Sequence, residues 1–284
     1  MINPNLFKSV CVQKTIFIFE NRLANFCQLM KLIDSHAHIY STEFDKDRTE
    51  AIKRSINAGI DRIIMPAIDS STHEDMLLLE KKYPATCISM MGLHPCSVKE
   101  NYEEELRIAE NYLENQKFIA VGEIGLDFYW DISFNDQQYA AFHRQIEFAL
   151  HYDIPVSIHS RNATDECIKV IQQHQKGKLK GVFHCFSGTL EQAGQLIELG
   201  FYLGIGGVLT FKNAGLDHLV KEIDLEHIIM ETDSPYLAPV PFRGKRNECS
   251  YISYIVQKLA DIKETPVDII AAITTENAEK LFGL

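Results

Sequence analysis

Residues 118–127 read Phe-Ile-Ala-Val-Gly-Glu-Ile-Gly-Leu-Asp, an apolar run that is followed by a carboxylate at Glu123. The run at 118–122 shows no alternation of polar and apolar side chains, which is typical of a parallel strand buried on both faces. Similar runs lie before and after it along the chain. Together they predict eight strands, at 31–34, 61–67, 86–92, 118–122, 154–158, 180–185, 201–205 and 227–231.

Segments with helical periodicity separate these runs. Tyr139, Phe142 and Ile146 recur at the three- and four-residue spacing of an amphipathic helix. Thr189 and Gln192 form a capping box at the start of another helix. Because strand and helix signals alternate without a linker, we expect a single-domain (β/α)8 TIM barrel, an α/β fold, in preference to an open doubly wound sheet.

The composition is that of a globular protein with an acidic net charge. The 28 Lys and Arg residues against 39 Asp and Glu residues give a net charge of −11. This charge excludes a uniformly basic surface, so a polyanion must be met by a local basic patch or by bound cations. No apolar run approaches the roughly 20 residues that cross a membrane. The seven cysteines lack a C-x-x-C motif and favour a reducing, cytoplasmic compartment.

Residues 1–29 differ from the rest of the chain. Gln13, Lys14 and Glu20 interrupt their apolar stretches, so the segment lacks the clean apolar region of a signal peptide. Met30 directly precedes the first predicted strand. We therefore expect residues 1–29 to be an N-terminal extension outside the core, consistent with an upstream start, and residues 30–284 to form the barrel domain.

Histidines and carboxylates stand at the ends of the predicted strands. In a barrel all these ends converge on one face, so the side chains are expected to meet there. His36 and His38 are two residues apart on an extended chain and point to the same side, as a chelating pair requires. Imidazole and carboxylate groups suit a divalent metal that promotes hydrolysis. The predicted ligands are His36, His38, Glu123, His159, His184 and Asp233.

These residues lie in motifs that resemble those of the TatD-type metal-dependent deoxyribonucleases, whose barrel is amidohydrolase-like. The resemblance covers the chain from about Lys31 to Leu284. Cys96 and Cys249 stand where members often carry histidine and proline, which affects substrate detail and not the ligand set. The matching motifs are His36-Ala-His38, Gly92-Leu-His94-Pro, Gly122-Glu-Ile-Gly-Leu-Asp127, Ile158-His-Ser-Arg161, His184-Cys-Phe-Ser-Gly188 and Glu231-Thr-Asp233-Ser-Pro.

The resemblance implies a centre of two divalent cations, with Mg, Mn, Zn and Co left open. Divalent ions activate water for hydrolysis, and Asp233 is expected either to accept the proton of that water or to act as a ligand alone. Glu123 is expected to bridge both ions. The implied ligand groups are His36, His38 and Asp233 for one ion, and His159 and His184 for the other.

The implied substrate is a phosphodiester of single-stranded DNA or of a DNA end, from which an exonuclease removes nucleotides in the 3′ to 5′ direction. Cationic side chains would stabilise the negative charge of the phosphate. Tyr129, with Trp130, either stacks on a base or packs as part of a lid. The expected substrate contacts are His94, Arg161, Arg243, Arg246 and Tyr129.

Two other functions stay open. The same centre would cleave esters or amides, including the ester bond of mischarged aminoacyl-tRNA, because hydroxide attacks carbon as well as phosphorus. A protein whose metal site is inert and serves as a scaffold is the third possibility, and the complete ligand set argues against it. Neither membrane attachment nor an obligate protein partner is predicted, and the sequence leaves the oligomeric state open.

Overall fold

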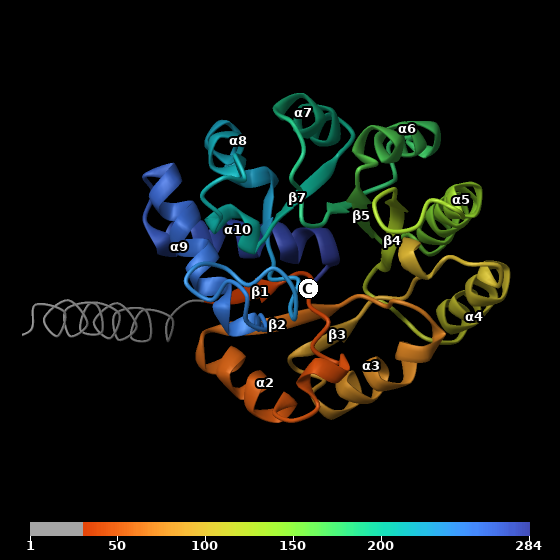
Figure 1. Ribbon diagram of the computed structural model, residues 1–284, viewed down its shortest axis with the longest axis horizontal. Helices are drawn as coiled ribbons and strands as arrows, with labels where there is room; N and C mark the ends of the chain where they lie inside the picture. The colour runs from red at the N-terminus through yellow and green to blue at the C-terminus, as the bar shows by residue number, and fades with distance from the viewer. Residues whose placement is uncertain (1–30) are drawn as a thin grey trace, which may run out of the picture.

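The computed structural model describes residues 31–284, and the predicted extension at 1–29 lies outside the described residues. Parallel strands form the centre of this region and helices surround them (Figure 1). Each predicted strand region overlaps one strand. The strands are β1 (Leu32–Asp34), β2 (Ile60–Met65), β3 (Cys87–Ser89), β4 (Val121–Asp127), β5 (Val156–Arg161), β6 (Gly181–Phe183), β7 (Phe201–Ile205) and β8 (Ile228–Met230).

Two sheet segments close into a barrel. β1 to β3 and β4 to β8 are each paired in chain order, and all the pairs are parallel. A bridge between Met91 and Val121 joins the two segments on one side. On the other side the backbone N–H of Asp233 donates to the carbonyl of His36 at 2.9 Å. The predicted (β/α)8 barrel is therefore confirmed.

The helices lie on the outside of the barrel, as Figure 1 shows. The capping box predicted at Thr189 and Gln192 begins α7. The α-helices are α2 (Arg48–Asn57), α3 (Ser70–Lys82), α4 (Tyr102–Asn115), α5 (Asn135–Tyr152), α6 (Thr164–His174), α7 (Leu190–Glu198), α8 (Leu216–Glu222), α9 (Ile252–Lys263) and α10 (Val267–Phe282). Short 3-10 helices are η1 (Thr42–Phe44), η2 (Pro95–Ser97), η3 (Gly207–Thr210), η4 (Leu225–His227) and η5 (Cys249–Tyr251).

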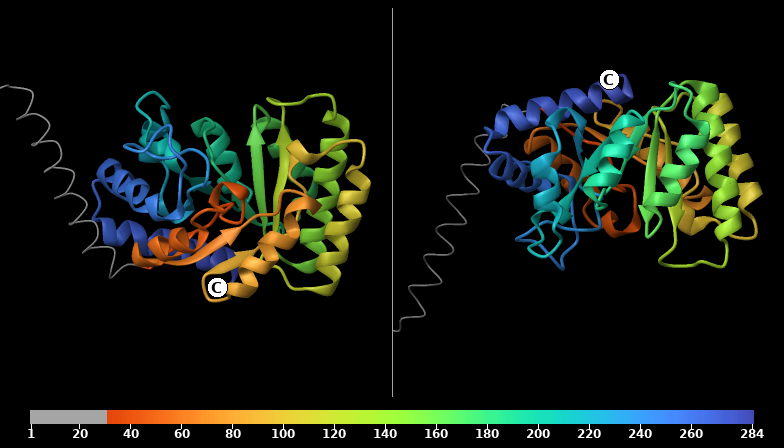
Figure 2. Two further views of the ribbon diagram at one scale, coloured as in Figure 1. Left: turned by 60° about the horizontal axis from the view of Figure 1, so that its bottom comes forward. Right: turned by 90° about the horizontal axis from the view of Figure 1, so that it is seen from above.

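The last helix seals one end of the barrel. Leu281 and Phe282 of α10 pack against buried apolar residues of the strand regions, among them Ile33, Ile64 and Ile229. The right-hand view of Figure 2 shows α10, in dark blue, lying across that end. Burial of this apolar surface stabilises the fold by about 25 cal/mol per Å². Because α10 covers the amino ends of the strands, a site can open only at their carboxyl ends.

Strands β4 and β5 extend further than the sequence predicted. We expected them to end before Glu123 and His159, but both residues lie inside their strands. Gly125 pairs with His159 and has a φ of +136°, and a Cβ atom there would lie 2.0 Å from the carbonyl oxygen of His159. The glycine therefore allows the two backbones to stay in contact beyond the polar residues that looked like strand ends.

Within residues 31–284, no helix combines the length and the apolar character that crossing a bilayer requires. The cysteines of this region are free thiols: Cys87, Cys96, Cys167, Cys185 and Cys249. The compartment predicted from cysteine usage stays a prediction.

Candidate metal centre

The six predicted ligands meet at the open end of the barrel. Two of them follow β1, one lies in β4, one lies in β5, and the others directly follow β6 and come shortly after β8. Their side chains are at most 16% exposed, so the cluster is shielded from bulk water. The members are His36, His38, Glu123, His159, His184 and Asp233.

The two carboxylate oxygens of Glu123 face different imidazoles. Its Oε2 atom lies 3.1 Å from Nε2 of His36 and 3.6 Å from Nε2 of His38. Its Oε1 atom lies 2.9 Å from Nδ1 of His159 and 3.1 Å from Nε2 of His184. Glu123 therefore stands between two pairs of imidazoles, with one carboxylate oxygen facing each pair.

Asp233 completes the side of the cluster that carries His36 and His38. Its Oδ1 atom lies 3.9 Å from Nε2 of His36 and 3.7 Å from Nε2 of His38. The donor atoms of these three residues all lie within 4.8 Å of one another, as do those of His36, Glu123 and His184. Burial raises the pKa of Asp233 to about 8, and a bound cation would oppose this by favouring the carboxylate.

The outer nitrogen of His38 is held by Tyr40. The two atoms, Nδ1 and the phenol oxygen, are 3.1 Å apart, and the same hydroxyl donates its proton to the carbonyl of Pro66 at 2.7 Å. Since a hydroxyl has one proton, Tyr40 must accept from the Nδ1–H of His38. The Nε2 lone pair of His38 is then free to bind a cation in the cluster.

The other ligand histidines also have polar partners on their outer sides. Nδ1 of His184 lies 3.4 Å from Oε1 of Glu231, and Nδ1 of His36 lies 3.3 Å from Oγ of Ser157. Such partners orient metal-binding imidazoles. The sequence analysis assigned no role to Glu231 or Ser157. Glu231 could have been found from its place in the same motif as Asp233, whereas Ser157 carries no local signal.

Asp127 is a further candidate functional residue, which the sequence analysis quoted without a role. Its Oδ2 atom lies 2.8 Å from Nε2 of His159, and its Oδ1 atom accepts the backbone N–H groups of Tyr129 and Trp130. Burial alone would raise the pKa of Asp127, but these hydrogen bonds outweigh it and hold the pKa well below its usual range. The ionised carboxylate therefore accepts a hydrogen bond from the Nε2–H of His159. The Nδ1 lone pair of His159 then points to the cluster.

His94 differs from the other histidines of the cluster in turning its protonated nitrogen toward the centre. Its Nδ1 atom accepts the backbone N–H of Cys96 at 3.0 Å, so a neutral imidazole carries its proton on Nε2. That atom lies 3.4 Å from Oε1 of Glu123 and faces the centre. His94 thus offers a hydrogen-bond donor at a place where the neighbouring histidines offer lone pairs.

A cavity of about 810 Å³ opens above the cluster. Arg161 lies on one side, with its guanidinium 4.1 Å from the ring centre of Tyr129 and 5.3 Å from that of Trp130. Arg243 lies against Phe211 at 4.0 Å. Trp130 is 67% exposed and lines the cavity, whereas Tyr129 is not among the lining residues and packs against Arg161 and Trp130 behind them. The cavity therefore combines guanidinium groups with exposed rings.

Arg246, which we predicted as a substrate contact, is not among the residues that line this cavity. Its guanidinium makes two hydrogen bonds to the carboxylate of Asp47, at 2.6 and 2.9 Å. The other basic residues of this segment, Arg243 and Lys245, do line the cavity. The role of Arg246 as a substrate contact stays a prediction, and the structure places three of its hydrogen bonds on protein: two on Asp47 and one on the carbonyl of Glu43.

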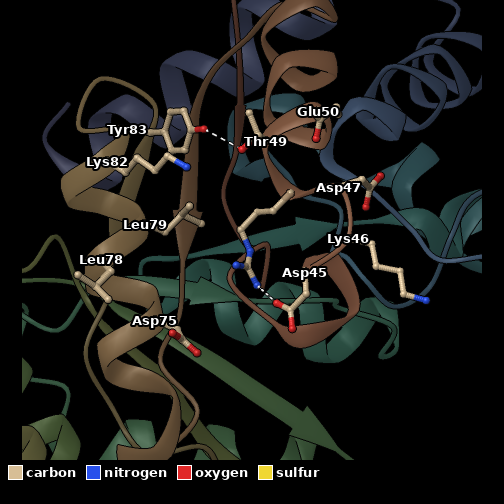
Figure 3. Close-up of a pocket in the computed structure, with 11 residues that line it drawn as sticks. Asp45, Lys46, Asp47, Thr49, Glu50, Asp75, Leu78, Leu79, Lys82 and Tyr83 are labelled. Carbon is tan, nitrogen blue, oxygen red and sulfur yellow. Dashed lines mark hydrogen bonds and ion pairs between the residues drawn. The ribbon is translucent and has the colours of Figure 1, made fainter.

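A second cavity, of about 540 Å³, lies between α3 and the segment that joins η1 to α2. Figure 3 shows its lining, including the contact between Thr49 and Tyr83. Asp45 forms an ion pair with Arg48 there. It contains none of the predicted site residues. The chemistry expected from the sequence therefore belongs to the cavity at the carboxyl ends of the strands.

Comparison with known proteins identifies a family, similar sequences and a similar solved structure. Residues 33–283 match the family described as TatD related DNase. The uncharacterized metal-dependent hydrolase YabD of Bacillus subtilis is 37% identical over 254 residues, which is 89% of this chain and 99% of that protein. The 3′-5′ ssDNA/RNA exonuclease TatD of Erwinia tasmaniensis is 30% identical over 259 residues, covering 89% of this chain and 100% of that protein. The crystal structure of YjjV, a TatD homologue from Escherichia coli K12, has a TM-score of 0.84 at 29% identity and covers 89% of this chain and 98% of its own.

Proposed function

Because the chain belongs to the TatD related DNase family of metal-dependent hydrolases, we propose that it removes nucleotides from the 3′ ends of single-stranded DNA by hydrolysing phosphodiester bonds. One observation carries this proposal. The two oxygens of Glu123 separate the imidazoles of the cluster into two pairs, and the cluster lies beneath a cavity lined with arginines and aromatic rings.

The residues present fit a pair of divalent cations. The donor set consists of buried imidazole nitrogens and carboxylate oxygens, each imidazole with a polar partner on its outer side. Such cations supply positive charge at the phosphate and make water more acidic. His36, His38 and Asp233 would hold one ion, His159 and His184 would hold the other, and Glu123 would contact both.

Three side chains at the centre act on the substrate. His94 and Arg161 donate hydrogen bonds to the phosphate oxygens on which negative charge accumulates. Asp233 has a side chain that is 13% exposed, against 2% for Glu123, and it lines the cavity. Glu123 lines the cavity too, so Asp233 is distinguished by its larger exposure to water, and we assign it the role of proton acceptor.

The rim of the cavity suits an unpaired strand. Exposed rings bind the faces of bases, which only an unpaired strand presents freely. Trp130 and Tyr236 are 67% and 49% exposed at the rim. Arg243 and Lys245 supply local positive charge on a chain whose net charge is −11. This arrangement supports a short contact with a strand end, since an acidic protein would repel a long duplex.

The test is nucleotide release from 5′-labelled single-stranded DNA by protein stripped of metal and resupplied with Mg or Mn. We expect a ladder that shortens from the 3′ end for the parent, and none for Asp233→Asn. Asp261→Asn is the matched control, because Asp261 is exposed in α9, outside the cavity. A parent that binds two ions but leaves DNA intact with every metal would overturn the proposal, and release of amino acid from charged tRNA would then indicate an esterase.

A further inference from the structure

The segment after β8 forms a tight turn at the cavity, and we call residues 242–246 the basic turn. The backbone N–H of Lys245 donates to the carbonyl of Phe242 at 3.0 Å, and Gly244 has a φ of +80°. The ring of Phe242 stacks on Tyr251 with centres 4.0 Å apart. The turn is thus fixed at its first residue, and it presents Arg243 and Lys245 to the cavity.

The last residue of the basic turn belongs to a network of two arginines and two carboxylates. Arg246 bonds Asp47 through two N–H groups, at 2.6 and 2.9 Å. Arg54 of α2 donates to Asp47 at 2.9 Å and to Glu248 at 2.6 and 2.9 Å. The four charges cancel, and Glu248 is only 8% exposed. We call Asp47, Arg54, Arg246 and Glu248 the ion ring.

The guanidinium of Arg246 makes two further contacts with the segment before α2. One N–H group also donates to the carbonyl of Glu43 at 2.9 Å, and the Cζ atom lies 4.3 Å from the ring centre of Phe44. Figure 3 shows the side chain of Asp47 on the opposite side of the second cavity from Leu79 and Tyr83. Arg246 is therefore bound to the segment before α2 and does not reach the substrate cavity.

The residue between Arg246 and Glu248 connects the ring to the metal centre. Asn247 is fully buried and donates to the carbonyls of Thr232 and Tyr236, at 2.8 and 2.6 Å. These carbonyls lie on either side of Asp233. The ion ring thus fixes one end of a segment whose other end carries a metal ligand.

We propose that the ion pair between Arg246 and Asp47 positions the basic turn. Arg243 and Lys245 then bind the phosphate of the DNA that is adjacent to the phosphate being hydrolysed. Arg246 is a positioning residue, and it acts through the other two cations. The inference rests on the proposed function for its substrate, a single-stranded polyanion. It adds a reason why an acidic residue, Asp47, promotes the binding of that polyanion.

The first test is the steady-state kinetics of single-stranded DNA hydrolysis by Arg246→Met and Asp47→Asn. We expect KM to rise about tenfold in both, the loss typical of weakened phosphate contacts, with kcat and metal affinity close to those of the parent. The two variants change the net charge in opposite directions. If charge alone mattered, Asp47→Asn would lower KM, and that outcome would overturn the proposal.

The second test separates positioning from direct contact. In a background carrying Arg243→Met and Lys245→Met, adding Arg246→Met is expected to leave KM unchanged, because the groups that it positions are already absent. A further rise in KM would show that Arg246 touches the substrate itself. Arg246→Lys, which keeps the charge but not the two-pronged contact, should fall between the parent and Arg246→Met.

Two controls separate the positioning of the basic turn from a general charge effect and from loss of activity. Asp45→Asn removes a nearby negative charge from a residue that is 59% exposed and paired with Arg48, so KM should not rise. Hydrogen exchange of a peptide covering residues 239–248 should become faster in Arg246→Met, whatever the substrate is. Faster exchange with an inactive parent would refute the proposed function alone, whereas unchanged exchange and KM in an active enzyme would refute the positioning role.

Discussion

Nε2 of His159 lies 2.8 Å from Oδ2 of Asp127, while Nδ1 of the same imidazole faces Glu123 at 2.9 Å. A carboxylate that accepts the outer N–H of a histidine fixes its tautomer and makes the inner nitrogen a stronger ligand. Asp127 is 1% exposed and its hydrogen bonds keep it ionised. It is therefore placed to support the proposed metal centre without touching it.

Replacing Asp127 by asparagine should weaken metal binding. We expect a loss of about 10- to 100-fold in affinity, the range typical of outer carboxylate partners, because the amide either donates to His159 or accepts more weakly. Competition with a chelating dye measures the affinity. Asp261→Asn is again the control for a lost surface charge, and an unchanged affinity for Asp127→Asn would contradict the assignment.

His94 and His159 should differ in what their substitution removes. His94→Gln takes away an N–H donor that faces the centre, so hydrolysis should slow by about 10²- to 10³-fold, the typical effect of losing one charge-stabilising donor, while metal affinity is kept. His159→Gln takes away a ligand, so metal affinity should fall. Parallel calorimetry and DNA hydrolysis on both variants test this. Loss of metal from His94→Gln would show that it is a ligand.

Substitution of Gly204 and of Gly194 by alanine should change the free energy of unfolding in opposite directions. A Cβ atom at Gly204 would lie 2.4 Å from Oε2 of the buried Glu231, whereas one at Gly194 in α7 meets nothing within 4 Å. Gly204→Ala should lower the free energy of unfolding by about 1–3 kcal/mol through overpacking. Gly194→Ala should raise it by about 0.5–1 kcal/mol, since alanine favours a helix. Urea unfolding measures both, and equal effects would disprove the expected clash.

Asp34 should make stability depend on pH. Burial raises its pKa to about 7 in the folded protein, although hydrogen bonds from Thr232 oppose the rise. Between pH 4 and pH 7 the folded chain then holds a proton that the unfolded chain has released. The free energy of unfolding therefore falls as pH rises through this window, by up to about 1.4 kcal/mol per pH unit.

Asp34→Asn should remove that slope. The measurement is urea unfolding at several pH values in the presence of a chelator, so that metal binding does not contribute. The difference between parent and variant isolates this carboxyl group from the other titrating residues. Parallel curves for the two proteins would show that Asp34 is ionised throughout.

The sequence was informative where a feature depends on residues close together in the chain, or recurs in every strand-and-helix unit of the barrel. Runs such as 118–122 are apolar because both faces of an inner strand are buried, so each predicted strand region overlaps a strand. The ends of parallel strands converge, which is why His36 and Asp233 could be placed together without a structure.

It was uninformative where a contact joins distant segments. Arg246 is predicted as a substrate contact from the sequence, and only the fold brings Asp47 to it. Asp127 gave no sign of its bond to His159, because strands β4 and β5 had been expected to end before either residue. A polar residue within an apolar run indicates a strand end unless the neighbouring backbone continues beside it, as Gly125 permits here.

The hydrogen bond between the backbones of Asp233 and His36 joins the first and last strands of the barrel next to the metal ligands. If the chain is divided between α4 and β4, His36 and His38 belong to one fragment and the other four ligands to the second. Neither fragment then chelates a cation with the full set. We expect divalent ions to drive reassembly of the two fragments, so that a split version of this protein would report metal concentration through recovery of its own fold.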